Sequence, residues 1–239
     1  MLLSSGAAHA EDEYRWAPPE VEDVRPHNGA SFSLGTMFVS PRLGDTIFTG
    51  DGTPVAGGPS GFRHTARDMG IAHPMLMGGE VRAAYVRRYI EVGIQGYMGG
   101  DLSGGDAGAS SVRPLVDAGN VSLIGGGGHI LGVIPVGPFS FTFGPDAGAR
   151  AFSVPLTGFR TYECQTKAGK KQCQEQATAQ QFYVEPRIGV LINTGSIGKR
   201  LESDGVFIHA WVGGDMIPAS SLAFGLSIGG AFNHAAMAP

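Results

Sequence analysis

Charged side chains inside otherwise apolar stretches are the residues of this chain with the most chemistry to offer. Between Phe182 and Ile192, large apolar side chains alternate with a polar set that includes Glu185 and Arg187. Successive side chains of a β-strand point to opposite faces, so the two charges share one face and the apolar residues share the other. The same alternation places eight ionisable residues opposite large apolar side chains: Glu80, Arg82, Glu91, Asp146, Arg150, Glu185, Arg187 and His209.

This set holds four acids, three arginines and one histidine, so its charges are nearly balanced. If the segments close into a barrel with the polar face inside, the charges must pair, because an unpaired buried charge is strongly destabilising. The lumen of a barrel of eight strands is just wide enough for its side chains to fill. We therefore predict a salt-bridged network that plugs the lumen. A proton or ion path along the same residues is the alternative.

Eight alternating segments position these charges. They cover residues 30–39, 75–86, 90–98, 120–133, 139–151, 182–193, 206–215 and 222–232. Two features interrupt the pattern. For the glycine run 125–128 we expect a β-bulge or a thin stretch of wall, and for Pro186 we expect a β-bulge.

The connections between these segments alternate in length. Long ones (41–74, 100–119 and 152–179) alternate with short ones (87–88 and 134–138), and only the last two (194–204 and 216–219) break the alternation. Long loops gathered at one end are typical of outer-membrane β-barrels.

Composition bounds the possibilities further. The chain has 239 residues, of which 42% are hydrophobic and 16% charged, with 39 glycines. It is too apolar for a disordered chain and too rich in glycine for a helical bundle. A formal net charge of -4 gives no reason to expect a nucleic-acid partner. No apolar run is long enough for a transmembrane helix, whose length is about 18 residues or more.

The N-terminal residues and the two cysteines suggest export. Residues 1–10 close on Ala8-x-Ala10, like the end of a signal peptide, and residues 11–29 form an extended arm with acids and prolines. Cys164 and Cys173, the only cysteines, flank a polar stretch, and we expect a disulfide formed in an oxidising compartment. No histidine lies near them, so we expect no metal site.

Taken together, the pattern from Ala30 to Phe232 resembles the small eight-stranded outer-membrane β-barrels of the OmpA/OmpX type. That family ends its last strand with a C-terminal aromatic residue. Here Phe232 has the right phase, but a short tail (233–239) follows it. The resemblance implies an all-β fold, an antiparallel up-and-down transmembrane barrel over residues 30–232, with short turns at one end and long loops at the other. It also implies an outer-membrane location, with the N-terminal arm (11–29) in the periplasm.

The function that we expect is non-enzymatic. The barrel would contact outer-membrane lipid, with a structural role or with extracellular or periplasmic protein partners engaged through its loops, and without a cofactor. Ser220, Ser221 and His234 fit a lipid-acting enzyme by residue type only, and no spacing supports a catalytic set. Two alternatives remain: a narrow channel or carrier for small or apolar solutes, and a secreted soluble binding barrel of lipocalin type, in which the polar set would face outward.

Overall fold

The computed structural model of the chain describes residues 28–50, 53–54, 62–87, 89–102, 120–136, 139–156, 159–160, 175–193, 205–216 and 221–233. These residues form β-strands and short connections. In this part of the chain, no helix is long and apolar enough to cross a membrane. The expected signal-peptide end, most of the N-terminal arm, Cys164, Cys173 and the tail after Asn233 lie outside the described residues.

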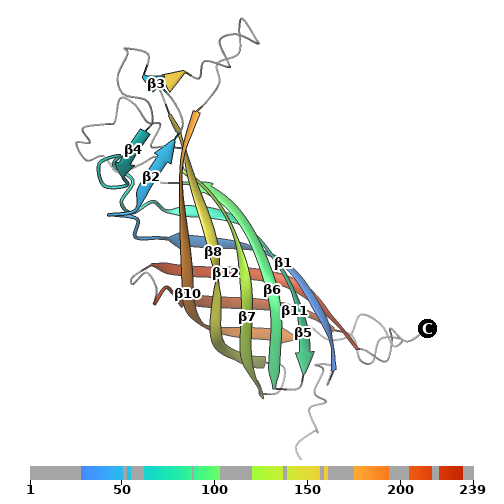
Figure 1. Cartoon of the computed structure of the whole chain (residues 1–239). Coiled ribbons are helices and arrows are strands. Elements are labelled where there is room, and N and C mark those ends of the chain that lie inside the picture. The colour runs from blue at the N-terminus through green and yellow to red at the C-terminus, as the bar shows by residue number, and fades with distance from the viewer. Residues whose placement is uncertain are drawn as a thin grey trace, which may run out of the picture.

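Eight antiparallel strands close into a barrel, which confirms the predicted fold class (Figure 1). Each strand pairs with the barrel strands before and after it in the chain, and β1 pairs with β12 to close the ring. The barrel strands are β1 (Asn28–Ser40), β5 (Leu76–Arg87), β6 (Ile90–Asp101), β7 (Ser122–Val136), β8 (Phe139–Leu156), β10 (Glu175–Asn193), β11 (Gly205–Gly214) and β12 (Leu222–Asn233).

Two of the predicted loops contain strands. The long loop after β1 holds the hairpin of β2 (Ile47–Gly50) and β4 (Phe62–Thr65), which joins β10 through the pair Thr49 and Thr178. A further two-stranded sheet pairs β3 (Thr53–Pro54) with β9 (Phe159–Arg160). Strands β8 and β10 are 18 and 19 residues long and rise beyond the other barrel strands (Figure 1). The alternating segments therefore continue into the region predicted to be a loop, at residues 152–156 and 175–179.

The strand order places each connection at one of the two ends of the barrel. The long connections β1–β5, β6–β7 and β8–β10 share one end of the barrel, and the connections β5–β6, β7–β8 and β10–β11 share the other. The β11–β12 connection lies at the long-loop end but is short, so the wall is low there. It lies next to the tall wall of β8 and β10, because β11 pairs with β10.

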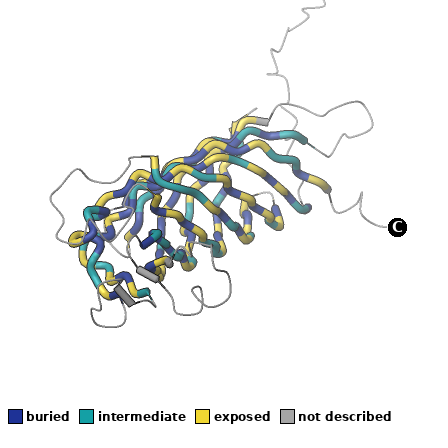
Figure 2. Tube along the Cα trace, turned by 90° about the horizontal axis from the view of Figure 1, so that it is seen from above, coloured by how far each residue is buried: buried dark blue, intermediate teal, exposed yellow. Residues whose placement is uncertain are grey.

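The outer surface of the barrel is apolar and its inner surface is polar. Burial alternates residue by residue along the strands (Figure 2). Large apolar side chains are exposed on every barrel strand, among them Phe32, Leu34, Val81, Ile94, Ile124, Ile130, Phe141, Phe143, Phe182, Ile188, Val212, Phe224, Leu226 and Ile228. Continuous exposed apolar surface of this extent marks a membrane-facing or protein-facing surface. It also opposes the soluble lipocalin-like alternative, which requires the polar face outside.

Neither expected bulge is present. The β8–β10 register is continuous from Glu175–Leu156 to Ile192–Phe139, and Pro186 pairs with Pro145 across it. The backbone N–H of Met216 donates to the carbonyl of Val184 at 2.8 Å, so alternate residues of this part of β10 turn their backbone groups toward β11. The β10–β11 ladder begins only at Arg187, so Pro186, which has no N–H to donate, stands where the ladder ends and causes no bulge.

The glycine run of β7 keeps a regular register with both neighbouring strands. A Cβ atom on Gly125 would lie 2.5 Å from the Tyr97 ring. Gly125 therefore leaves room for the lumenal Tyr97 side chain of β6, and the run as a whole has no side chains whose size could alternate.

Above the barrel at the long-loop end, the described residues form a small apolar core. We call this region the cap (residues 41–50 and 62–75, with β8 from Phe152 and β10 as far as Gln181). Its buried side chains are Leu43, Phe48, Phe62, Met69, Ile71, Phe152, Val154, Leu156, Ala177 and Ala179. Its outer face carries exposed polar side chains such as Gln176, Thr178 and Gln180. The cap is thus apolar inside and polar outside.

A tight turn supports the cap. The hydroxyl and the backbone N–H of Thr65 donate to Asp68 Oδ2 at 2.7 and 3.2 Å. The backbone N–H of Asp68 in turn donates to the Thr65 hydroxyl at 3.2 Å. Hydrogen bonds to the ionised carboxylate favour it, so those from Thr65 hold the pKa of Asp68 below its ordinary value.

Candidate functional site: the lumenal ionic network

All eight ionisable residues singled out from the sequence lie on the lumenal face, and none is more than 8% exposed. They come from β5, β6, β8, β10 and β11. Because an eight-stranded barrel is narrow, side chains from opposite walls meet near its axis.

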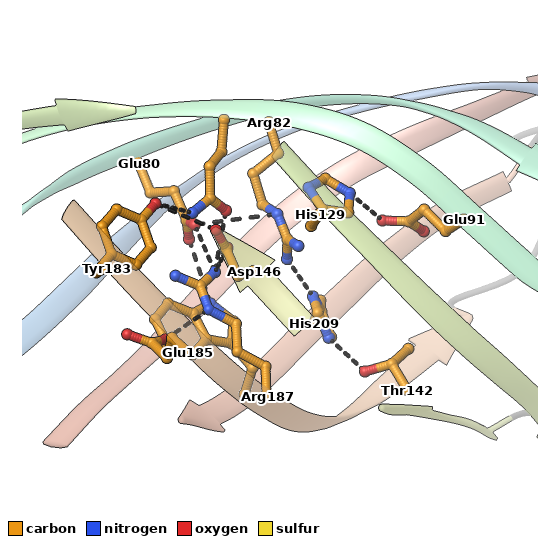
Figure 3. Close-up of polar contacts among 12 residues, drawn as sticks. Glu80, Arg82, Glu91, His129, Thr142, Asp146, Tyr183, Glu185, Arg187 and His209 are labelled. Carbon is orange, nitrogen blue, oxygen red and sulfur yellow. Dashed lines mark hydrogen bonds and ion pairs between the residues drawn. The ribbon is translucent and has the colours of Figure 1, made fainter. Parts of the chain in front are cut away.

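Arg187 is the centre of the network (Figure 3). Its Nε donates to Glu185 Oε1 at 2.6 Å, and its Nη1 lies 3.2 Å from Glu80 Oε1 and 3.1 Å from Asp146 Oδ2. The same Nη1 donates to Gln95 Oε1 at 3.0 Å. Three carboxyl groups thus share one guanidinium, which is planar, permanently charged and rich in donors.

An aromatic side chain completes the surroundings of Arg187. Its guanidinium carbon lies 3.7 Å from the centre of the Trp211 ring, within the range of a cation–π contact. The Trp211 indole donates to Glu80 Oε2 at 3.2 Å. Trp211 therefore contacts both ions of the Arg187–Glu80 pair. It fits there because Gly225 on β12 has no side chain, and a Cβ atom at that position would lie 2.6 Å from the indole.

The Glu80–Arg187 pair joins opposite walls. Glu80 lies on β5 and Arg187 on β10, and three strands separate β5 from β10 in either direction around the barrel. Arg82, also on β5, has its Nε 3.9 Å from Glu80 Oε1. The network therefore braces the barrel across its diameter.

A second polar layer lies on the short-turn side of Arg187. Arg82 Nη1 is 3.2 Å from His209 Nδ1, and His209 Nε2 is 3.0 Å from the Thr142 hydroxyl. A guanidinium can only donate, so His209 Nδ1 accepts, and the ring is neutral with its proton on Nε2. His209 therefore does not supply the positive charge that the sequence-based balance counted. In the same layer, His129 Nε2 contacts Glu91 Oε1 at 3.2 Å.

A third group of contacts lies toward the long-loop end. Arg150 bonds to Asp215 through Nη2 and to Gln181 Oε1 through Nε, the latter at 2.9 Å. The Ser221 hydroxyl also donates to Asp215. These contacts tie the short β11–β12 connection to the tall wall of β8 and β10.

Sequence reasoning missed several members of the site: Gln95, His129, Tyr183, Trp211 and Asp215. Alternation alone places four of them on the polar face, but they are neutral or lie at a strand end. His129 was hidden by the glycine run; counting back from the outward Ile130 and Ile134 would have placed it inside.

Buried apolar side chains lie on both sides of the polar layers. Leu191, Phe207 and Ala231 pack together near the short-turn end. Met37, Val39, Leu123 and Phe152 are buried at the other end and continue into the cap core. The ionic network is therefore enclosed between two apolar layers.

Among the described residues, no three His, Cys, Asp or Glu side chains are grouped to hold a metal ion. Ser221, one of the residues considered for a lipid-acting site, instead bonds to Asp215. Ser220 and His234 lie outside the described residues.

Likeness to known proteins is found among solved structures. No protein-family model and no curated protein matches the chain. Among solved structures, it is similar to Ail, the attachment invasion locus protein of Yersinia pestis, with 10% identity, 87% of this chain and 98% of Ail covered, and a TM-score of 0.40. It is also similar to Neisserial surface protein A, with 11% identity, 86% and 99% covered, and a TM-score of 0.43. A structure of Ail with the heparin analogue sucrose octasulfate shows 9% identity, 86% and 98% coverage, and a TM-score of 0.38.

Proposed function

We propose that this protein is a non-enzymatic outer-membrane barrel with a closed lumen, and that it acts through its cap and long loops. The observation that carries the proposal is the opposite polarity of the two regions. The barrel exposes apolar side chains and encloses charges, whereas the cap exposes polar side chains and encloses apolar ones. This division suits a barrel in lipid beneath a cap in water.

The remaining parts of the proposal follow the same orientation. Strand β1 begins at the short-turn end of the barrel, so the arm before it would lie in the periplasm after removal of a signal peptide. The loops at the cap end would face outside, with Cys164 and Cys173 joined by a disulfide. Lipid would contact the apolar belt, and extracellular proteins are the partners that loops in this position would meet.

A closed lumen is supported by its contents. The Arg187 network crosses the barrel, and apolar layers lie on both sides of it. Since a narrow lumen occupied by paired charges leaves no continuous water path, the role of the protein would lie at its surface. A narrow channel is the outcome that would contradict this part of the proposal.

Membrane fractionation tests the location. The full-length protein should sediment with the outer membrane, require detergent for extraction, and show a heat-dependent change in gel mobility. Recovery in the soluble fraction without detergent would contradict the barrel's place in a membrane.

Planar-bilayer recording tests the closed lumen. The wild-type protein should show no unitary conductance, whereas Arg187→Ala, which removes the central side chain, should admit ions. Arg67→Ala on the cap surface is the matched control and should stay silent. Steady conductance by the wild-type protein would favour the channel alternative.

A further inference from the structure

The lumenal network contains more acids than bases. Around Arg187 and toward the long-loop end lie four buried carboxyl groups, Glu80, Asp146, Glu185 and Asp215. Only three guanidinium groups (Arg82, Arg150 and Arg187) accompany them. If all seven were ionised, the group would carry one uncompensated negative charge. Glu91 lies apart from these seven groups and contacts His129, and His209 is neutral because it accepts from Arg82.

Burial makes this excess costly. Each of the seven side chains is at most 6% exposed. An uncompensated charge in such surroundings loses its hydration, and a buried group that lacks a partner charge takes the neutral form instead. We therefore expect one of the four carboxyl groups to be protonated in the folded protein.

The hydrogen bonds distinguish the four acids. Glu80 accepts from Arg187 and Trp211, Glu185 accepts from Arg187 Nε at 2.6 Å, and Asp215 accepts from Arg150 and Ser221. Asp146 has the weakest set of donors. Its Oδ1 contacts only the neutral Tyr183 hydroxyl at 3.1 Å, and its Oδ2 lies 3.1 Å from Arg187 Nη1 without accepting a hydrogen bond.

We propose that Asp146 is a neutral carboxylic acid in the folded protein and holds the one proton that balances the network. This assignment reverses the hydrogen bond that the Tyr183 hydroxyl donates to Oδ1 in the ionised form. The proton lies on Oδ1 and is donated to the Tyr183 oxygen, which also accepts from Gln95 Nε2 at 3.2 Å, and the Tyr183 hydroxyl proton rotates away from Asp146. Oδ2 is then the carbonyl oxygen that faces Arg187. Asp146 is fully buried, and its register partners are His129 on β7 and Glu185 on β10. The other buried titratable groups of the described residues are Glu80, Arg82, Glu91, Tyr97, Arg150, Tyr183, Arg187, His209 and Asp215.

Infrared spectroscopy of the full-length protein in lipid bilayers tests this assignment. Near neutral pH, exposed acids are ionised, so the carbonyl stretch of a protonated carboxyl group reports buried acids only. We expect one such band per chain in the wild-type protein. Asp146→Asn should remove it. Glu91→Gln, a matched control in the adjacent layer, should leave it unchanged.

The same variant gives a second readout. Asparagine has the shape of a neutral aspartic acid, with an N–H group to donate to Tyr183 and a carbonyl for Arg187. Asp146→Asn should therefore change the folded-to-unfolded ratio by less than about tenfold, whereas breaking a buried ion pair changes it by about a hundredfold or more.

Two results would overturn the proposal: absence of the band from the wild-type protein, and its persistence in Asp146→Asn. The inference goes beyond the proposed function and does not depend on what the loops bind. A barrel that conducts ions or lacks a loop partner would still show the band, so the two proposals fail separately.

Discussion

The barrel and the cap follow the same strand alternation but place opposite chemistry on each face. Strand β10 runs through both. In the cap, its outward residues are polar (Gln176, Thr178 and Gln180), and its inward residues Ala177 and Ala179 are apolar. From Phe182 onward the outward residues are apolar, with Phe182 itself 79% exposed, and the inward residues are Tyr183, Glu185 and Arg187. The register does not shift between the two parts.

The medium around each region, water or lipid, explains which face of the strand is apolar. A strand in water buries its apolar face, and a strand in lipid turns that face outward and encloses its polar groups. The change between Gln181 and Phe182 therefore marks where β10 would leave the membrane. Matched substitutions in the barrel and the cap test whether the same change has different effects on the stability of the two regions.

The largest expected difference concerns arginines. Arg187→Met leaves the carboxyl groups of Glu80, Asp146 and Glu185 without their shared partner, and removing one member of a buried ion pair costs about 3–5 kcal/mol. Arg67→Met removes only an exposed pair with Asp45 at 3.5 Å, where the loss is at most about 1 kcal/mol. Urea unfolding in lipid vesicles measures both. Equal losses would mean that the lumen is as hydrated as the cap surface.

A pair of phenylalanines gives the next comparison. Phe48 is fully buried in the cap, and Phe48→Ala leaves a cavity that should destabilise the cap by about 3–5 kcal/mol. Phe141 is half exposed on the outer barrel face, where lipid can occupy the vacated space. Phe141→Ala should therefore cost less. Hydrogen exchange of residues 41–50 and 62–75 reports the cap, and the heat-dependent gel shift reports the barrel. A Phe48→Ala variant with unchanged exchange would contradict the cap core.

Added charge on the outer face of β10 probes the boundary directly. Ile188→Arg places an arginine on the apolar belt, where the cost is about 2–4 kcal/mol near the membrane midplane. Gln180→Arg makes the equivalent change on the cap side and should alter the free energy of unfolding by no more than about 0.5 kcal/mol. Unfolding of both variants in lipid vesicles measures the difference. If Ile188→Arg is tolerated as well as Gln180→Arg, the belt does not face lipid.

The sequence predicted the barrel well because lipid exposure gives a strong period-two pattern. It placed the eight charges on one face of the segments, opposite the face that carries the large apolar residues. It could not predict the Glu80–Arg187 contact, which depends on closure of the ring and on two residues more than 100 positions apart. Nor could it predict the cap core, because Phe48 and Phe62 form short strands whose burial depends on the extensions of β8 and β10. The bulge expected at Pro186 was wrong because an edge can exist locally inside a barrel, where one ladder ends before its neighbour.

The smallest expected effect concerns Asp68, which is exposed and belongs to the cap turn alone. Its pKa is lowered in the folded state by hydrogen bonds from Thr65, so its contribution to stability is present above the ordinary pKa of 3.8 and is lost as pH falls through the lower folded value. Acid should therefore loosen the wild-type turn slightly, and Asp68→Asn should remove that pH dependence while leaving the barrel unchanged. Hydrogen-exchange rates of residues 62–75, recorded at pH values above and below this pKa interval, measure the loosening of the turn. The opposite result would be an acid effect of similar size on the barrel strands of the wild-type protein that Asp68→Asn abolishes. It would show that cap and barrel unfold together, as one cooperative unit despite their opposite polarity.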